Sequence, residues 1–200
     1  MSVQLMPTVV VLAAGRGERF ARTGGSEHKL EAVLGGVPVL ERVMRSVHAS
    51  GLPFHIVRPR EGSRADTDGM GDSIARGVAA TAQAAGWLIL PGDLPFITPS
   101  SLVRVASGLA SHAVVLPFWN GQQGHPVGFD QSCGAALTAL GGDLGAAVIV
   151  RERRQAGQVH TLHLDDPGIV TDIDTMDDLK QAEALLAAPG NPTGAFFGKR

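Results

Sequence analysis

The sequence predicts an α/β fold, a three-layer α/β/α sandwich that is Rossmann-like in the broad sense and has a mostly parallel sheet. Short runs of β-branched and apolar residues alternate with segments of helical periodicity, which is typical of a parallel sheet covered by helices on both faces. In addition, 44% of the 200 residues are apolar and 18% are charged, which is enough to bury a core. A single domain is therefore expected over residues 1–188.

Strand signals recur along the chain at 8–13, 54–58, 87–91, 113–117, 126–129 and 158–164. Helical segments lie between most of them. Residues 38–50 carry apolar side chains on one face, and residues 73–85 are rich in alanine. Another helix is expected to begin at Thr98, a capping residue followed by proline. The last helix is expected to begin at Thr175, with two acidic residues in a first turn where they suit the helix dipole.

Composition narrows the range of functions. The formal net charge of −2 argues against a general nucleic-acid binder. No apolar run of about 18 residues and no signal-peptide pattern occurs, so a cytoplasmic protein without a membrane partner is expected. Cys133, the only cysteine, excludes an intrachain disulfide and is expected to lie in the core. Residues 59–68 are expected to form a polar loop, and residues 189–200, rich in glycine and proline, a flexible tail.

A glycine-rich loop follows the first predicted strand. The chain there reads Leu12-Ala13-Ala14-Gly15-Arg16-Gly17-Glu18-Arg19-Phe20, and Lys29 follows. Small residues let the backbone approach a ligand, and successive N–H groups in such a turn bind anions. Arg16, Arg19 and Lys29 add positive charge, so the segment predicts a polyphosphate site. It is not a dinucleotide fingerprint, because Phe20 replaces the third glycine, and it lacks the Gly-Lys of a Walker loop.

A second polar turn, Gly92–Pro95, also follows a buried strand. Ligands of parallel sheets bind at the carboxyl ends of the strands, so we expect this turn and the glycine-rich loop at the same rim. Asp93 would then face the loop, where magnesium is typically held by one or two carboxylates and substrate phosphates. Asp174 is the first candidate for a second carboxylate. Asp172 is the second, because the two residues alternate along an extended segment and share a face.

Two further segments are candidates for the same site. Gly69, Met70, Gly71, Asp72 and Ser73 open a predicted helix. Its first N–H groups would take an anion, or the loop would contact a ribose or base, and the plain alternative is a capping turn. His125 precedes Pro126 and a strand, and we expect an active-site position for it, with a structural role as the alternative.

Taken in order, these motifs resemble the molybdenum cofactor cytidylyltransferase family, relatives of the molybdenum cofactor guanylyltransferases. The matching segments are Leu12–Phe20 with Lys29, Gly69–Val78, Trp87–Pro95, Gly124–Phe129, Gly142–Ala146 and Asp172–Thr175. They extend over residues 8–187, nearly the whole chain. The guanylyltransferases tend to have a glycine where this chain has Ala14, which favours cytidine over guanosine.

The resemblance implies a nucleotidyltransferase fold and a magnesium-dependent transfer of CMP from CTP to the phosphate of a molybdopterin-type cofactor, with release of pyrophosphate. Catalytic roles are implied for Arg16, Arg19, Lys29 and Asp93, and metal binding for Asp93 and Asp174. The residues implied in binding the nucleotide or the acceptor are Leu12, Ala13, Ala14, Gly15, Gly17, Lys29, Gly69, Met70, Gly71, Ser73, Gly92 and His125. A client molybdoenzyme is an implied partner. The alternatives are a related transferase using GTP or another phosphorylated acceptor, and a non-catalytic molybdenum cofactor chaperone.

Overall fold

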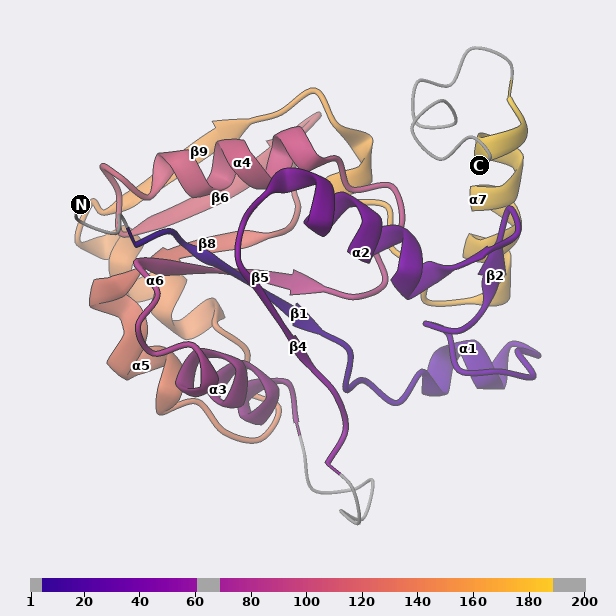
Figure 1. Ribbon diagram of the computed structural model, residues 1–200, viewed down its shortest axis with the longest axis horizontal. Helices are drawn as coiled ribbons and strands as arrows, with labels where there is room; N and C mark the ends of the chain where they lie inside the picture. Colours follow the sequence, from indigo (N-terminus) through magenta and orange to yellow (C-terminus); the bar gives the residue numbers. More distant parts are fainter. Residues whose placement is uncertain (1–4, 61–68, 189–200) are drawn as a thin grey trace.

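The computed structural model describes residues 5–60 and 69–188, and its centre is a twisted sheet (Figure 1). The seven strands of this sheet are β1 (Thr8–Leu12), β4 (Phe54–Val57), β5 (Gly86–Pro91), β6 (Val114–Trp119), β7 (Gln122–Gln123), β8 (Val127–Asp130) and β9 (Val159–His163). Their order is β4-β1-β5-β8-β6-β7, with β9 on β6. Strands β4, β1, β5, β6 and β9 share one direction, while β8 and β7 run against their neighbours. The predicted mostly parallel sheet is confirmed.

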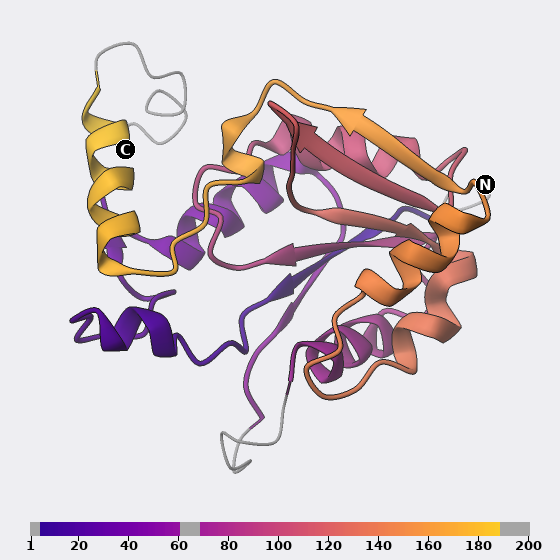
Figure 2. The same ribbon diagram turned by 180° about the vertical axis from the view of Figure 1, so that it is seen from behind.

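Helices cover both faces of the sheet, which confirms the three-layer architecture (Figures 1 and 2). Helices α2 (Val39–Ser50) and α4 (Pro99–Gly108) lie on one face, and α3 (Met70–Ala80), α5 (Gly134–Thr138) and α6 (Ala147–Gln155) on the other. Helices α1 (Glu18–Arg22) and α7 (Met176–Ala187) lie together beyond one end of the sheet, near the hairpin of β2 (Val33–Leu34) and β3 (Val37–Pro38). Two short 3-10 turns, Gln131–Cys133 and Pro167–Ile169, complete the described elements.

Strand β1 explains why the sheet is covered on both sides. Val9 and Val11 belong to the apolar cluster formed with α2 and α4, whereas Val10 belongs to the cluster formed with α3. All three side chains are fully buried. Because successive side chains of a strand point to opposite faces, an uninterrupted apolar run requires a helix layer on each side.

The predicted strands agree closely with the observed ones, and the caps at Thr98 and Thr175 are confirmed by bonds from Ser101 N and Asp178 N to the threonine hydroxyls. Cys133 is fully buried, as predicted. The two-residue strands β2, β3 and β7 are not predicted by the sequence. The tail at 189–200 and most of the loop at 59–68 lie outside the described residues. Within the described part, no helix is long and apolar enough to cross a membrane.

The alanine-rich helix differs from its predicted bounds, because α3 spans Met70–Ala80 instead of 73–85. It begins earlier because the Asp72 carboxylate accepts a bond from the Gly69 N–H, which closes the first turn. It ends earlier because the Thr81 hydroxyl donates to the Gly77 carbonyl and accepts from the Trp87 indole. Threonine side chains of this kind compete with the backbone for hydrogen bonds and favour helix ends.

Candidate active site

A cavity of about 660 Å³ lies at the carboxyl ends of β1 and β5. Most of the predicted site residues line it: Leu12, Ala14, Gly15, Arg16, Gly17, Arg19, Lys29, Gly69, Met70, Ser73, Asp93 and Asp174. Glu18, Arg22, Leu30, Pro91 and Asp143 also line it and were not among the predicted residues. The loop after β1 and the turn after β5 therefore meet at one rim, as the strand-end argument predicts.

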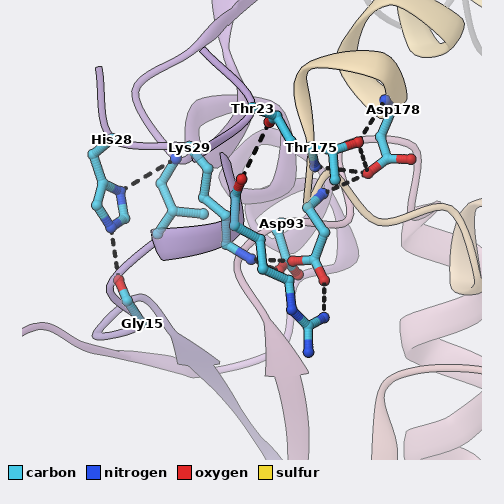
Figure 3. A network of polar contacts seen from close by, with 10 residues as sticks. Gly15, Thr23, His28, Lys29, Asp93, Thr175 and Asp178 are labelled. Carbon is cyan, nitrogen blue, oxygen red and sulfur yellow. Dashed lines mark hydrogen bonds and ion pairs between the residues drawn. The ribbon is translucent and has the colours of Figure 1, made fainter. Parts of the chain in front are cut away.

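The centre of the cavity is an ion network that includes Lys29 (Figure 3). Its Nζ donates to Asp93 Oδ2 and to Asp174 Oδ1, each at 2.6 Å. Arg19 Nη1 donates to Asp174 Oδ2 at 2.9 Å. The Lys29 and Asp93 side chains are only 14% and 15% exposed, so their attraction is weakly screened by solvent. The two carboxylates predicted from the sequence thus converge on one cationic group.

The network keeps Lys29 and Asp174 charged at neutral pH. Burial by itself disfavours the Lys29 ammonium, but the charge of Asp93 and the hydrogen bonds to both carboxylates raise the pKa of Lys29. Burial likewise disfavours the Asp174 carboxylate, but the hydrogen bonds and charges of Lys29 and Arg19 lower the pKa of Asp174. Asp172, by contrast, has a raised pKa, chiefly through burial and also through the neighbouring carboxylates. Asp174 lines the cavity, whereas Asp172 is not among the lining residues.

Backbone contacts explain how residues far apart in sequence meet here. The Gly92 N–H donates to the Leu12 carbonyl at 3.0 Å, which holds the turn after β5 against the loop after β1. The Ile173 N–H donates to the Asp93 carbonyl at 3.0 Å, which places the segment before α7 beside the same turn. The Asp178 carboxylate then accepts from the N–H groups of Asp174 and Thr175 and fixes the Asp174 backbone (Figure 3).

The glycine-rich loop has its own local supports. Gly17 precedes α1 with φ of 63°, a left-handed conformation that favours glycine. His28 Nε2 lies 2.6 Å from the Gly15 carbonyl oxygen, so this histidine ties the loop to the segment that carries Lys29 (Figure 3). Glu18 accepts from Arg16 at 3.4 Å and from Arg22 at 2.8 Å. An acid inside a cationic loop gives no motif signal, so the sequence does not predict this part of the site.

Four predicted residues do not line the cavity. Ala13 is buried, and Gly92 packs so closely that a Cβ would lie 3.0 Å from the Leu12 carbonyl oxygen. Gly71 packs on the segment at 141–144. The His125 backbone N–H donates to the Ile169 carbonyl, and its ring Nδ1 is buried without a hydrogen-bond partner among the described residues. Burial lowers the pKa of His125 although the charge of Asp93 opposes the shift, so this ring is neutral at pH 7.

The start of α3 differs from a free helix terminus. The Gly69 N–H donates to the Asp72 carboxylate and the Gly71 N–H to the Gly142 carbonyl, so these two donors already have partners. The bond from the Gly69 N–H to Asp72 is the capping turn, the plain alternative for this segment.

Fold and site together define a class of protein. The protein has an α/β fold with a mixed β-sheet. At the carboxyl ends of its parallel strands, a glycine-rich cationic loop faces a pair of carboxylates. This arrangement is typical of enzymes that act on nucleoside triphosphates. The chain belongs to the family of MobA-like NTP transferase domains, since the family model matches residues 9–159. Membership of this family identifies the protein as a nucleotidyltransferase.

Solved structures agree with this assignment at the level of the fold. The Rv0371c protein of Mycobacterium tuberculosis H37Rv is 21% identical, with a TM-score of 0.72 over 92% of this chain and 100% of that one. A nucleotidyl transferase from Methanothermobacter is 20% identical, with a TM-score of 0.71 over 90% and 96%. Molybdopterin-guanine dinucleotide biosynthesis protein A from Archaeoglobus fulgidus is 18% identical, with a TM-score of 0.55 over 89% and 97%. A manganese complex of Rv0371c is also similar, at 22% identity and a TM-score of 0.63 over 90% and 98%. No curated protein matches the sequence.

Proposed function

We propose that the protein transfers CMP from CTP to the phosphate of a molybdopterin-type cofactor and releases pyrophosphate. The observation that carries the proposal is the convergence of Lys29, Asp93 and Asp174 in a cavity bounded by the glycine-rich loop. Cations on a backbone turn bind a triphosphate, and paired carboxylates bind the divalent ion that accompanies it.

The triphosphate would be held by this chain's cations and backbone. The N–H groups of residues 14–17 offer donors at the end of β1, and Arg16, Arg19 and Lys29 line the same cavity. Arg19 is the most exposed of the network, with 78% of its side chain accessible, and it can leave Asp174 for a phosphate at small cost. Each such cation would bring charge-assisted hydrogen bonds to the phosphates.

The residues present fit a divalent ion. Asp93 Oδ1 is buried and has no hydrogen-bond partner in the described part of the chain, although its Oδ2 is bound by Lys29. Among the described residues, no group of three or more acidic, histidine or cysteine side chains could hold a metal ion by itself. Asp93 and Asp174 would therefore hold it together with substrate phosphates, as is usual for magnesium. When bound, the ion would offset the negative charge of the phosphates. The manganese complex of the similar Rv0371c protein supports this assignment.

The transfer needs no general base. An oxygen of the acceptor phosphate, already ionised at neutral pH, attacks the α-phosphorus of CTP, and the bond from that phosphorus to the oxygen bridging the β-phosphorus breaks. The products are the cytidine dinucleotide and pyrophosphate. The chain contributes by holding both reactants in line and by placing Lys29 and the arginines where charge accumulates on the leaving group. His125 is not among the residues that line the cavity.

The choice of CTP and of the acceptor is supported by fewer observations than the choice of reaction. CTP is favoured by Ala14, which lines the cavity and adds a methyl group where the guanosine-type loop has glycine. The acceptor is favoured by the ordered motifs and by the similar Archaeoglobus fulgidus protein, whose name includes molybdopterin-guanine dinucleotide biosynthesis. A client molybdoenzyme would receive the product. The alternatives are another nucleotide or phosphorylated acceptor, and a chaperone that binds the cofactor without reacting.

Pyrophosphate release tests the proposal. The purified protein is incubated with molybdopterin-type cofactor, magnesium and each of the four nucleoside triphosphates, and with each triphosphate alone. We expect release with CTP that requires both the acceptor and magnesium, and that disappears in Asp93→Asn. Pyrophosphate release with GTP only, or with another phosphorylated acceptor only, would show that the protein is a related nucleotidyltransferase with other substrates. Tight cofactor binding with no release from any triphosphate would indicate a chaperone.

A further inference from the structure

The cavity described above has walls of opposite character. The wall formed by the glycine-rich loop and Lys29 is mainly cationic, with Arg16, Arg19, Arg22 and Lys29 against the single acid Glu18. The other wall is formed by the start of α3 and by Asp143, from the loop that joins α5 and α6. Figure 1 shows α1 and the start of α3 on the two sides of the end of β1. A ligand that fills this space would meet positive charge at one end and a carboxylate at the other.

The second wall is held rigidly by contacts between its two segments. Asp72 Oδ2 accepts from the N–H groups of Gly69 and Gly142, at 2.9 Å each. The Gly71 N–H donates back to the Gly142 carbonyl at 2.8 Å. The backbones approach so closely at Gly69 that a Cβ there would lie 2.1 Å from the Gly142 carbonyl oxygen. These bonds fix the backbone on which Asp143 stands, so Asp72 acts as a positioning residue.

This wall is unsuited to a phosphate group. The N–H groups of Gly69 and Gly71 are already used, and both Asp72 and Asp143 carry negative charge. It is suited to a heterocycle with an amino group, because an ionised carboxylate only accepts hydrogen bonds. Met70 adds an apolar surface beside it: its side chain lines the cavity, is 57% exposed, and has its sulfur against Gly145. Thioethers make favourable contacts with aromatic rings.

We infer that Asp143 is a specificity-determining residue that accepts a hydrogen bond from the exocyclic amino group of the base, with Met70 beside the ring. The inference rests on the proposed function, because it takes the triphosphate to lie against the cationic wall. Cytosine presents an amino group where uracil presents a carbonyl oxygen. The Asp143 carboxylate therefore accepts from cytosine and repels uracil, although the two bases have nearly the same size. A site built to bind a donor rejects an analogue that lacks it.

Calorimetric titration of CTP and UTP in the presence of magnesium tests this assignment directly. We expect wild type to bind CTP roughly tenfold to a hundredfold more tightly than UTP, the range of one hydrogen bond to a charged group. Asp143→Asn should bring the two affinities to within about threefold, because an asparagine amide both donates and accepts. Asp165→Asn is the matched control, since Asp165 is exposed and does not line the cavity. Unchanged circular dichroism of Asp143→Asn confirms that the fold is retained.

The outcomes separate this inference from the proposed function. Equal binding of CTP and UTP by wild type, or an unchanged preference in Asp143→Asn, overturns the role of Asp143 while triphosphate binding stands. Failure of every triphosphate to bind wild type removes the proposed function itself. The acceptor's pterin ring also carries an amino group, so binding of a pterin monophosphate is measured with the same variants. If Asp143→Asn weakens the pterin and leaves the CTP preference intact, Asp143 belongs to the acceptor subsite and the assignment to the base is wrong.

Discussion

Replacing Lys29 by methionine is expected to destabilise the protein and to make its stability depend on a divalent cation. Methionine keeps the apolar stem of lysine but removes the ammonium that lies 2.6 Å from both Asp93 and Asp174. The two carboxylates then face each other without a cation between them. Lys29 is 14% exposed and is paired with both carboxylates, so its removal is expected to lower stability without preventing folding.

The size of the effect follows from the geometry. Removing one partner of a fully buried ion pair costs about 3–5 kcal/mol. Asp174 is 31% exposed, so part of the penalty is relieved by water. We expect a loss of about 2–3 kcal/mol in the free energy of unfolding, below the fully buried range for that reason. For a chain of this size, each kcal/mol lowers Tm by about 2–4 °C, so the expected decrease is about 4–12 °C.

Differential scanning calorimetry in EDTA and in excess magnesium measures both parts of this prediction. Magnesium should raise the Tm of Lys29→Met more than that of wild type, because in the variant the ion neutralises the two carboxylates that the Lys29 ammonium neutralises in wild type. Lys180→Met is the control: its pair with Asp177 has 69% and 81% of the two side chains exposed, and its removal should leave Tm nearly unchanged. A Lys29→Met variant as stable as wild type in EDTA would refute the reasoning.

Four further outcomes are expected. Asp93→Asn should abolish magnesium-dependent pyrophosphate release with unaltered circular dichroism, because asparagine keeps the turn chemistry and loses the charge; full activity at low magnesium would leave Asp93 only a turn former. Arg19→Ala should raise the KM for CTP roughly tenfold with little change in Tm, since it loses a charge-assisted contact from an exposed side chain; an unchanged KM would remove it from the site. Ala14→Gly should relax the preference for CTP over GTP in a competition assay without reversing it, since one methyl group is worth about 1–3 kcal/mol. Burial disfavours the charged form of Asp174, but the bonds to Lys29 and Arg19 lower the pKa of its carboxyl group. The stability that this carboxylate contributes is therefore fully present above the unfolded-state pKa of about 3.9, and it is lost as pH falls through the lower folded-state pKa. Urea unfolding of Asp174→Asn at several pH values should show a weaker loss of stability in acid than wild type.

The sequence by itself determined the fold class and most of the cavity wall. The uninterrupted apolar run of β1 could be satisfied only by a sheet covered on both faces, and the alternation of strands with helices then required parallel pairing. Glycines and cations that directly follow such a strand had to lie at its carboxyl end. The same local argument located Asp93, because it follows β5, the neighbour of β1 in the sheet.

Only the tertiary structure decided how the charged groups pair. No pattern in the sequence indicates that Lys29 bridges Asp93 and Asp174, because the bridge depends on the bond from Ile173 N–H to the Asp93 carbonyl. The position of His125 could not be predicted locally either. A histidine before a strand can face the cavity or the interior, and here its backbone N–H is bonded to the Ile169 carbonyl, from a distant part of the chain.

Asp143 illustrates the same division. Its sequence neighbours identify a turn, but its place in the cavity wall depends on Asp72, whose carboxylate binds backbone groups from two segments that are distant in the chain. Local propensity reports what a residue does with its near neighbours along the chain. Charge pairing and loop docking depend instead on distances between strand ends, and these are set when the sheet assembles and its helices pack on both faces.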